Sequence, residues 1–250
     1  MGMPCDLASI LPIARAHGIP LIEDAACAAG SEILWEGRWQ RIGGPVADAA
    51  CFSFHPRKVL TTGDGGMITT PHPEWDRKFR QLRHHGMNVP AHARHKSPQV
   101  IFESYDVAGF NYRLTDLQAA VGREQVRKLD QIVERRRHLA ARYTGLFTGL
   151  ASTPYEPEYA RSNWQSYCIR LDGRKPQREV MQALLDRGIA TRRGVMCAHL
   201  EPAYPPGSWR SADLRQSEWA RDNTVILPLF PAMTEAEQDF VVSALREVLS

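Results

Sequence analysis

Helix-like and strand-like segments alternate along the first third of this chain. Apolar side chains recur at helical spacing in two segments and form short continuous runs in three others. In chain order these are a helix at residues 6–17, strands at 19–22, 49–54 and 67–70, and a helix at 73–84. Asp6 is the expected N-cap of the first helix and Gly18 its stop. The alternation predicts a layered α/β domain with a mainly parallel sheet, in which the strand at 19–22 is buried.

The second half of the chain has a different pattern. Residues 115–146 predict one long helix, capped by Thr115 or Asp116, with an apolar stripe running from Leu117 to Leu139. Residues 154–157 mark a linker, and beyond it the elements are shorter. They are a strand at 164–171, a helix at 176–187 and a final amphipathic helix at 234–249. We therefore predict a large domain over residues 1–150 and a small α+β domain over residues 151–250.

Charge and cysteine usage narrow the function classes. The 31 basic and 28 acidic residues are well mixed, which argues against the clustered basic face of a nucleic-acid partner. The densest basic run, Arg135-Arg-Arg137, is expected to be a solvated face of the long helix. The five cysteines are odd in number and have no paired spacing, so we expect no disulfide framework and no metal site, in a reducing, cytoplasmic setting. No apolar run is long enough to span a bilayer, so no membrane partner is expected.

Two reactive side chains follow predicted strands. Asp24 ends the first apolar run, and Lys58 follows the second, just before the turn Gly63-Asp-Gly-Gly66. Ligands of α/β sheets bind beyond the carboxyl ends of the strands. A lysine for a Schiff base and a carboxylate for a pyridinium nitrogen are the two protein groups that pyridoxal phosphate chemistry needs most. Each also has a structural interpretation: Lys58 as a solvated charge, Asp24 as a helix cap, and the glycines as a hairpin turn.

Six ordered motifs reach from one end of the chain to the other. They are Ile22-Glu-Asp-Ala-Ala26, Phe52-Ser-Phe-His-Pro-Arg-Lys58, Thr62-Gly-Asp-Gly-Gly-Met67, His85-Gly86, the stretch 109–120, and Leu227-Pro-Leu-Phe-Pro231. In this order the chain resembles the DegT/StrS-type aminotransferases, which act mostly on nucleotide-linked keto-sugars. The resemblance implies a large domain of the pyridoxal-phosphate-dependent, aspartate-aminotransferase-like class (fold type I), followed by a small α+β C-terminal domain.

The resemblance also implies roles for residues that contact the cofactor. Lys58 is expected to form the Schiff base and, once freed, to move a proton as general base and acid. Asp24 is expected to keep the pyridine nitrogen protonated. Ser53 matches a position that binds the cofactor phosphate from the strand end. Asn111 matches one that reaches the phosphate of the neighbouring subunit, so a homodimer with a shared active site is expected. 

Four further positions are assigned through the resemblance. Cys27 lies where the family usually has a glutamine or histidine that touches the cofactor's 3′-oxygen. A thiol is a shorter and poorer donor, so we expect a weak contact there or a bridging water. His55, Arg113 and His199 are placed on the substrate side, with a structural role for His55 as an equal alternative. 

The implied activity is transamination from glutamate to a keto-sugar, most often nucleotide-linked, in amino-sugar, polysaccharide or antibiotic biosynthesis. A cyclitol ketone is an alternative acceptor. Family members begin with a further segment of strands and cofactor contacts, and Met1-Gly-Met-Pro-Cys-Asp6 resembles an internal stretch of the family. We therefore expect an N-terminally incomplete large domain. The competing hypothesis is a catalytically inactive member that acts only as a dimerising or regulatory fold remnant.

Overall fold

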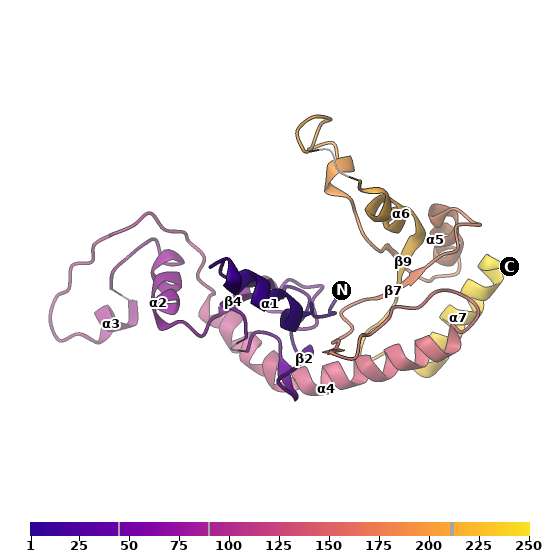
Figure 1. Cartoon of the computed structure of the whole chain (residues 1–250). Coiled ribbons are helices and arrows are strands. Elements are labelled where there is room, and N and C mark those ends of the chain that lie inside the picture. Colours follow the sequence, from indigo (N-terminus) through magenta and orange to yellow (C-terminus); the bar gives the residue numbers. More distant parts are fainter. Residues whose placement is uncertain (45, 90, 211–212) are drawn as a thin grey trace. The chain divides into compact units, whose positions relative to one another are not determined.

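The computed structural model describes residues 1–44, 46–89, 91–210 and 213–250 (Figure 1). The chain divides into two compact units, one formed by Pro4–Leu129 and the other by Met1–Met3 together with Asp130–Ser250. The predicted division at residue 150 into a large and a small domain stays a prediction.

The first unit begins with the predicted helix. Helix α1 spans Leu7–Ala16, and the Asp6 carboxylate caps it by accepting a hydrogen bond from Ser9 N at 3.1 Å. Gly18 follows with φ of 62°, a conformation that glycine adopts without strain. Leu7 and Leu11 lie one turn apart and are buried, so this helix packs through one apolar face.

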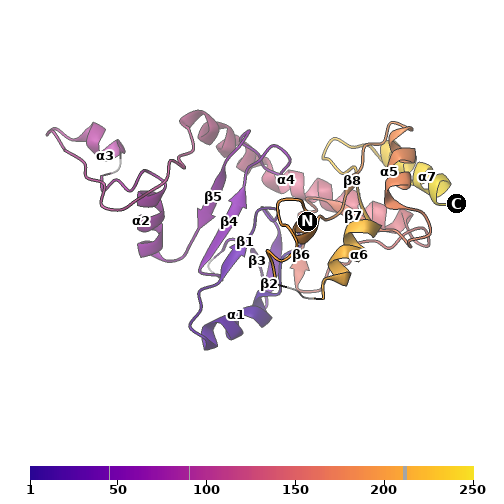
Figure 2. The same ribbon diagram turned by 90° about the horizontal axis from the view of Figure 1, so that it is seen from above.

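A three-stranded sheet carries the candidate site. Strands β1 (Ile22–Asp24), β4 (Ala49–Ser53) and β5 (Gly66–Thr69) lie side by side in the order β1-β4-β5 (Figure 2). β1 runs parallel to β4, with Asp24 opposite Cys51, whereas β5 runs antiparallel to β4. The described sheet is thus mixed, because the glycine turn folds β5 back onto β4. 

The prediction of a buried strand at residues 19–22 is wrong. The strand begins only at Ile22, and the side chains of Ile19 and Ile22 are 60% and 61% exposed. Pro20 has no N–H to donate, and Leu21 N donates to the Asp48 carboxylate at 2.7 Å instead of to a neighbouring strand. β1 also stands at one end of the described strand order, so it packs against a single neighbour.

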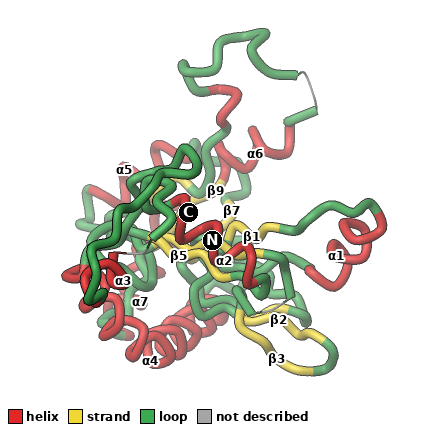
Figure 3. Tube along the Cα trace, turned by 90° about the vertical axis from the view of Figure 1, so that its left-hand side faces the viewer, coloured by secondary structure: helices red, strands yellow, loops and turns green. Residues whose placement is uncertain are grey.

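The remaining elements of this unit include a β-hairpin and two helices. Strands β2 (Glu32–Trp35) and β3 (Arg38–Arg41) form an antiparallel hairpin, seen as two adjacent yellow segments in Figure 3. Helices α2 (Pro73–Leu82) and α3 (Ala91–Lys96) follow β5, and α2 confirms the helix predicted at 73–84. The core of the unit consists of buried apolar residues from α1, β2, β4 and the intervening loops: Leu7, Leu11, Ala25, Ala28, Ile33, Ile42, Val46 and Ala50.

The long predicted helix is present, but its apolar stripe is only partly buried. Helix α4 spans Asp116–Leu146, and Thr115 Oγ1 caps it by accepting from Gln118 N at 3.2 Å. Leu117 is 83% exposed, whereas Leu129 and Leu139 are buried. The sequence pattern therefore predicted the helix correctly, and the apolar stripe is exposed at its start and buried farther along.

The arginine run on α4 is not a solvated face. Arg136 is 6% exposed, and its Nε and Nη2 donate to the carbonyl oxygens of Trp164 and Gln165, both at 2.8 Å. Arg135 donates to the Met233 carbonyl and Arg137 to the Ser162 carbonyl. All three guanidinium groups thus bind backbone carbonyls of the second unit, which satisfies buried acceptors that no strand pairs with.

The second unit is an α+β assembly that includes the C-terminal half of α4. Strands β7 (Tyr167–Arg170), β9 (Thr224–Leu227) and β8 (Arg192–Arg193) form an antiparallel sheet in the order β7-β9-β8. Helices α5 (Gln177–Leu185) and α7 (Glu235–Leu249) were both predicted. The other elements are β6 (Ala160–Arg161), a 3-10 helix (Ala198–Leu200) and α6 (Arg215–Asn223).

The core of this unit is fully enclosed. Its fully buried members include Tyr143, Phe147, Tyr167, Ile169, Leu227 and Leu245. The predicted strand at 164–171 begins three residues late, because Trp164 has φ of 51° and so cannot lie in an extended strand. Across the described ranges of both units, no helix has the length and apolarity needed to cross a membrane.

Candidate active site

Asp24 and Lys58 follow neighbouring parallel strands. Asp24 is the last residue of β1, and Lys58 lies in the loop that leaves β4. Since β1 and β4 run parallel, both residues belong to the carboxyl edge of the sheet, where α/β sheets bind ligands. The Asp24 side chain is exposed, and its Oδ1 accepts from Ala26 N at 3.1 Å. Its other carboxylate oxygen accepts no hydrogen bond from the described part of the chain.

The loop that carries Lys58 is held by hydrogen bonds at both ends. Phe54 N donates to the Gly65 carbonyl at 2.8 Å, and the Phe54 carbonyl in turn accepts from Thr62 N and Thr61 Oγ1. Lys58 N donates to the His55 carbonyl at 2.9 Å, which closes a tight turn. The lysine therefore projects from a fixed turn at the sheet edge, and its side chain is half-buried.

The Lys58 amine contacts Cys27. Its Nζ donates to Cys27 Sγ at 3.0 Å, although the two residues are 31 positions apart. Cys27 follows β1 in the turn after Asp24, so this contact joins the two loops that leave the parallel strands. The three predicted residues Asp24, Cys27 and Lys58 therefore belong to one edge of one unit.

Ser53 and His55 organise the start of the same loop. Ser53 Oγ accepts from His55 N at 3.3 Å, and His55 Nδ1 accepts from Arg57 N at 3.2 Å. Because Nδ1 accepts, the proton of the neutral imidazole lies on Nε2. Both side chains thus stabilise the turn that presents Lys58, while the Ser53 hydroxyl and the His55 Nε2–H retain a donor each.

Asn111 and Arg113 lie on a segment packed against the end of α2. Phe110 N donates to the Leu82 carbonyl at 2.6 Å, and Asn111 forms an isolated antiparallel bridge with His84. The close approach requires glycine: a Cβ on Gly109 would lie 2.8 Å from the Leu82 carbonyl oxygen and closer still to Gly86 N. The side chains of Asn111 and Arg113 are exposed.

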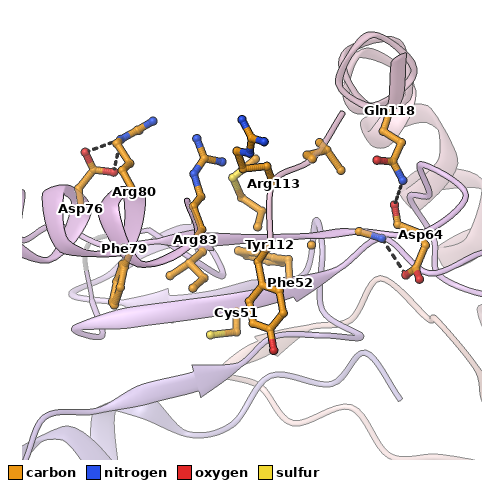
Figure 4. Close-up of a pocket in the computed structure, with 15 residues that line it drawn as sticks. Cys51, Phe52, Asp64, Asp76, Phe79, Arg80, Arg83, Tyr112, Arg113 and Gln118 are labelled. Carbon is orange, nitrogen blue, oxygen red and sulfur yellow. Dashed lines mark hydrogen bonds and ion pairs between the residues drawn. The ribbon is translucent and has the colours of Figure 1, made fainter. Parts of the chain in front are cut away.

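A cavity of about 670 Å³ lies between this segment, α2 and β5 (Figure 4). Phe52, Phe79 and Tyr112 contribute aromatic surface to it, and three arginines, Arg80, Arg83 and Arg113, extend to the same side of the strands. Asp76 pairs with Arg80 Nε at 2.9 Å. The guanidinium groups of Arg83 and Arg113 give the rim of this cavity a positive charge.

His84 was missed by the sequence analysis. Both of its ring nitrogens are buried, and neither has a hydrogen-bond partner among the described residues. Burial, together with the positive charge of Arg113, lowers the pKa of His84 below its ordinary value, which favours the neutral imidazole. His84 directly precedes the motif His85-Gly86 and gave no signal in the sequence, because its burial depends on the distant segment around Asn111 that pairs with it.

His199 lies in the second unit. Its Nε2 is 2.9 Å from Glu218 Oε1, and its ring packs edge-on against Trp209 at a centroid distance of 5.1 Å. The imidazole is therefore held by a carboxylate from α6. Among the described residues, no group of three or more histidine, cysteine, aspartate or glutamate side chains is arranged to hold a metal ion.

Comparisons with known proteins agree with the motif order. The sequence model of the DegT/DnrJ/EryC1/StrS aminotransferase family matches residues 1–246. The spore coat polysaccharide biosynthesis protein SpsC of Bacillus subtilis is 33% identical over 255 residues, which cover 99% of this chain and 64% of SpsC.

Solved structures show the same fold. The structure of S. venezuelae DesV in complex with a ketimine intermediate superposes with a TM-score of 0.84 at 32% identity, covering 100% of this chain and 63% of DesV. Helicobacter pylori PseC, an aminotransferase involved in the biosynthesis of pseudoaminic acid, superposes with a TM-score of 0.87 at 21% identity, covering 98% of this chain and 64% of PseC.

This chain thus spans less than two thirds of the length of these three proteins. Over that span the fold is that of the pyridoxal-phosphate-dependent sugar aminotransferases, fold type I, as the superpositions on DesV and PseC establish. With nearly every residue matched by the family's sequence model and a third of the positions identical to SpsC, the chain belongs to the DegT/DnrJ/EryC1/StrS aminotransferase family.

Proposed function

We propose that this protein is a pyridoxal-phosphate-dependent aminotransferase that transfers an amino group from glutamate to a keto-sugar, and that this keto-sugar is nucleotide-linked. The observation that carries the proposal is the placement of Asp24 and Lys58 at the carboxyl edge of adjacent parallel strands, in a chain of this family. The biosynthetic roles of SpsC and PseC favour a sugar acceptor used for polysaccharides or related amino sugars.

The residues present fit the cofactor. Lys58 supplies an amine on a fixed turn, and Asp24 supplies an exposed carboxylate with one oxygen that accepts no hydrogen bond from the described residues. Ser53 retains a hydroxyl donor at the end of β4. When bound, pyridoxal phosphate supplies an aldehyde that combines with amines and a ring that withdraws electrons from the carbon being deprotonated.

The chain's own groups then have distinct tasks. Asp24 holds a proton at the pyridine nitrogen, because a carboxylate favours the charged pyridinium. Lys58, once its amine is free, takes a proton from the substrate carbon and returns it elsewhere as general base and acid. Ser53 would donate to the cofactor phosphate, and Cys27 lies beside the lysine at the same edge.

Substrate contacts and assembly complete the proposal. Arg113 offers an exposed guanidinium suited to a carboxylate or phosphate of the substrate, and His55 and His199 offer imidazole donors. Asn111, exposed on its segment, would reach the phosphate bound by a second copy, so we propose a homodimer with a shared active site. The five free thiols favour a reducing, cytoplasmic location.

The test is reduction of the purified chain with borohydride in the presence of pyridoxal phosphate, followed by peptide mass mapping. We expect a phosphopyridoxyl group concentrated on Lys58 and absent from the exposed Lys78 on α2. The Lys58→Arg variant, which keeps the charge, should lose the label. Labelling scattered over surface lysines would contradict the assigned site.

Amino transfer is tested separately. Unreduced protein that carries pyridoxal phosphate is incubated with amino donors. Formation of pyridoxamine phosphate is followed by absorbance and chromatography. Glutamate should give the fastest conversion, and a nucleotide-linked keto-sugar should regenerate the aldehyde. Retention of the cofactor without conversion by any donor would contradict the proposed activity and favour an inactive family member.

A further inference from the structure

The contact between Lys58 and Cys27 places a nucleophilic amine beside an oxidisable sulfur. Lys58 Nζ lies 3.0 Å from Cys27 Sγ, and both side chains are half-buried, so neither is closed off from solvent. The two residues stand on separate loops, each anchored to its own strand of one parallel pair. The distance is therefore set by the sheet and does not depend on a single flexible segment.

The other four thiols are poorer targets for an oxidant. Burial raises the pKa of the Cys51 and Cys168 thiols, and burial together with the charge of Glu23 raises that of Cys5. Cys197 is 4% exposed. Cys27 differs from these four thiols in its contact with Lys58 Nζ, which lies within hydrogen-bond distance of its sulfur.

We propose that hydrogen peroxide converts Cys27 and Lys58 into a reversible covalent pair, in which Cys27 Sγ is bonded directly to Lys58 Nζ. In the first step the Cys27 sulfur attacks one peroxide oxygen, the O–O bond breaks, and the products are a sulfenic acid and water. In the second step the neutral Lys58 amine attacks that sulfur, an S–N bond forms, and the sulfenic oxygen leaves as a second water. Sulfur is oxidised by two electrons, and one peroxide is reduced.

The link would remove the amine that the proposed function requires, and this consequence rests on that function. Lys58 cannot combine with an aldehyde while its nitrogen is bonded to sulfur. Attack by an added thiol on Cys27 Sγ breaks the S–N bond, returns the Lys58 amine and leaves a mixed disulfide that a second thiol reduces. The pair therefore acts as an oxidation-sensitive block that a reducing cytoplasm reverses.

The experiment treats the whole chain, without pyridoxal phosphate, with one to ten equivalents of hydrogen peroxide. Remaining thiols are alkylated, and the protein is digested with trypsin and mapped by mass spectrometry. We expect the peptide 16–38, which contains Cys27, joined to the peptide 58–77, with cleavage missed after Lys58. The joined species should be lighter than the sum of the two peptides by two hydrogen atoms, and dithiothreitol should separate it.

Matched variants identify the two atoms. Cys27→Ser and Lys58→Arg should each abolish the joined species, whereas Cys51→Ser, which removes the thiol opposite Asp24 in the sheet, should leave its yield within twofold. A disulfide from Cys27 to another cysteine would overturn the proposal. So would further oxidation of Cys27 without a joined peptide, or a joined species heavier by an oxygen atom.

The outcome is separable from that of the proposed function. The joined peptide is measured without the cofactor, while attachment of pyridoxal phosphate to Lys58 is measured by borohydride labelling. Prior attachment of pyridoxal phosphate to Lys58 should lower the yield of the joined peptide at least tenfold, because the nitrogen is then occupied. A joined peptide in a chain that never takes the label would support the inference and contradict the proposed function.

Discussion

Replacing Arg136 with methionine measures how much a buried charge on α4 stabilises the second unit. The side chain is 6% exposed, and its Nε and Nη2 each donate to a carbonyl at 2.8 Å. Methionine has a similar unbranched stem and fills the same space, but it cannot donate. The Trp164 and Gln165 carbonyls would lose these donors.

The expected loss follows from those two hydrogen bonds. Each hydrogen bond from a charged donor contributes about 2 kcal/mol net, so the pair contributes about 4 kcal/mol. Desolvation opposes it, because burial disfavours the charged form and lowers the pKa of Arg136 to about 10. We therefore expect the free energy of unfolding to fall by about 3 kcal/mol, toward the lower end of the range for two such bonds.

Urea unfolding followed by circular dichroism measures this change, with thermal unfolding as a second readout. A loss of about 3 kcal/mol corresponds to a fall in Tm of roughly 6–12 °C for a chain of this size. Arg123→Met is the matched control, because Arg123 is exposed on the same helix and has no partner among the described residues. Its effect should stay within about 0.5 kcal/mol. Equal effects of the two variants would refute the reasoning.

Two further substitutions test the hydrogen bonds and the close packing that stabilise the unit carrying the candidate site. Asp48→Asn should lower the free energy of unfolding by about 1 kcal/mol at pH 7, since hydrogen bonds from Leu21 N and His72 hold the pKa of Asp48 below its usual range. A lowered folded-state pKa stabilises the fold at pH values above the pKa of the unfolded state. The difference from wild type should therefore shrink as pH falls below about 4 and be lost as pH falls through the folded-state pKa, and a constant difference would contradict this origin. Gly109→Ala should cost about 2 kcal/mol by urea unfolding, because its Cβ would overlap Gly86 N. Gly145→Ala, where nothing lies near the added methyl group, should be neutral or stabilising, and comparable losses would argue against the packing explanation.

Features that depend on a few neighbouring residues were predicted well. The Asp6 cap of α1, the Thr115 cap of α4 and the glycine turn before β5 involve hydrogen bonds or backbone angles within four residues of chain. Such signals are present in the sequence whatever packs around them. The helices α1, α2, α4, α5 and α7 were therefore located to within a few residues of their ends.

Burial was predicted less well, and it failed in both directions. Ile19 and Ile22 are apolar and exposed, whereas Arg136 is charged and buried. An apolar run signals that a segment can be buried, but the outcome depends on how many strands flank it. A guanidinium can be buried wherever distant backbone carbonyls remain without partners, and sequence spacing does not show where those carbonyls are.

The candidate site shows the same division between local and distant information. The order of the motifs identified Asp24, Ser53 and Lys58 as residues of one sheet edge, since each ends or follows a predicted strand. The hydrogen bond from Lys58 to Cys27 was not predicted, because it joins two loops across 31 positions. Cys27 was interpreted only as a weak substitute for a better donor to the cofactor. The Cys27 thiol lies beside the Lys58 amine. Any reaction that modifies its sulfur therefore also changes the surroundings of the nitrogen on which the proposed activity depends.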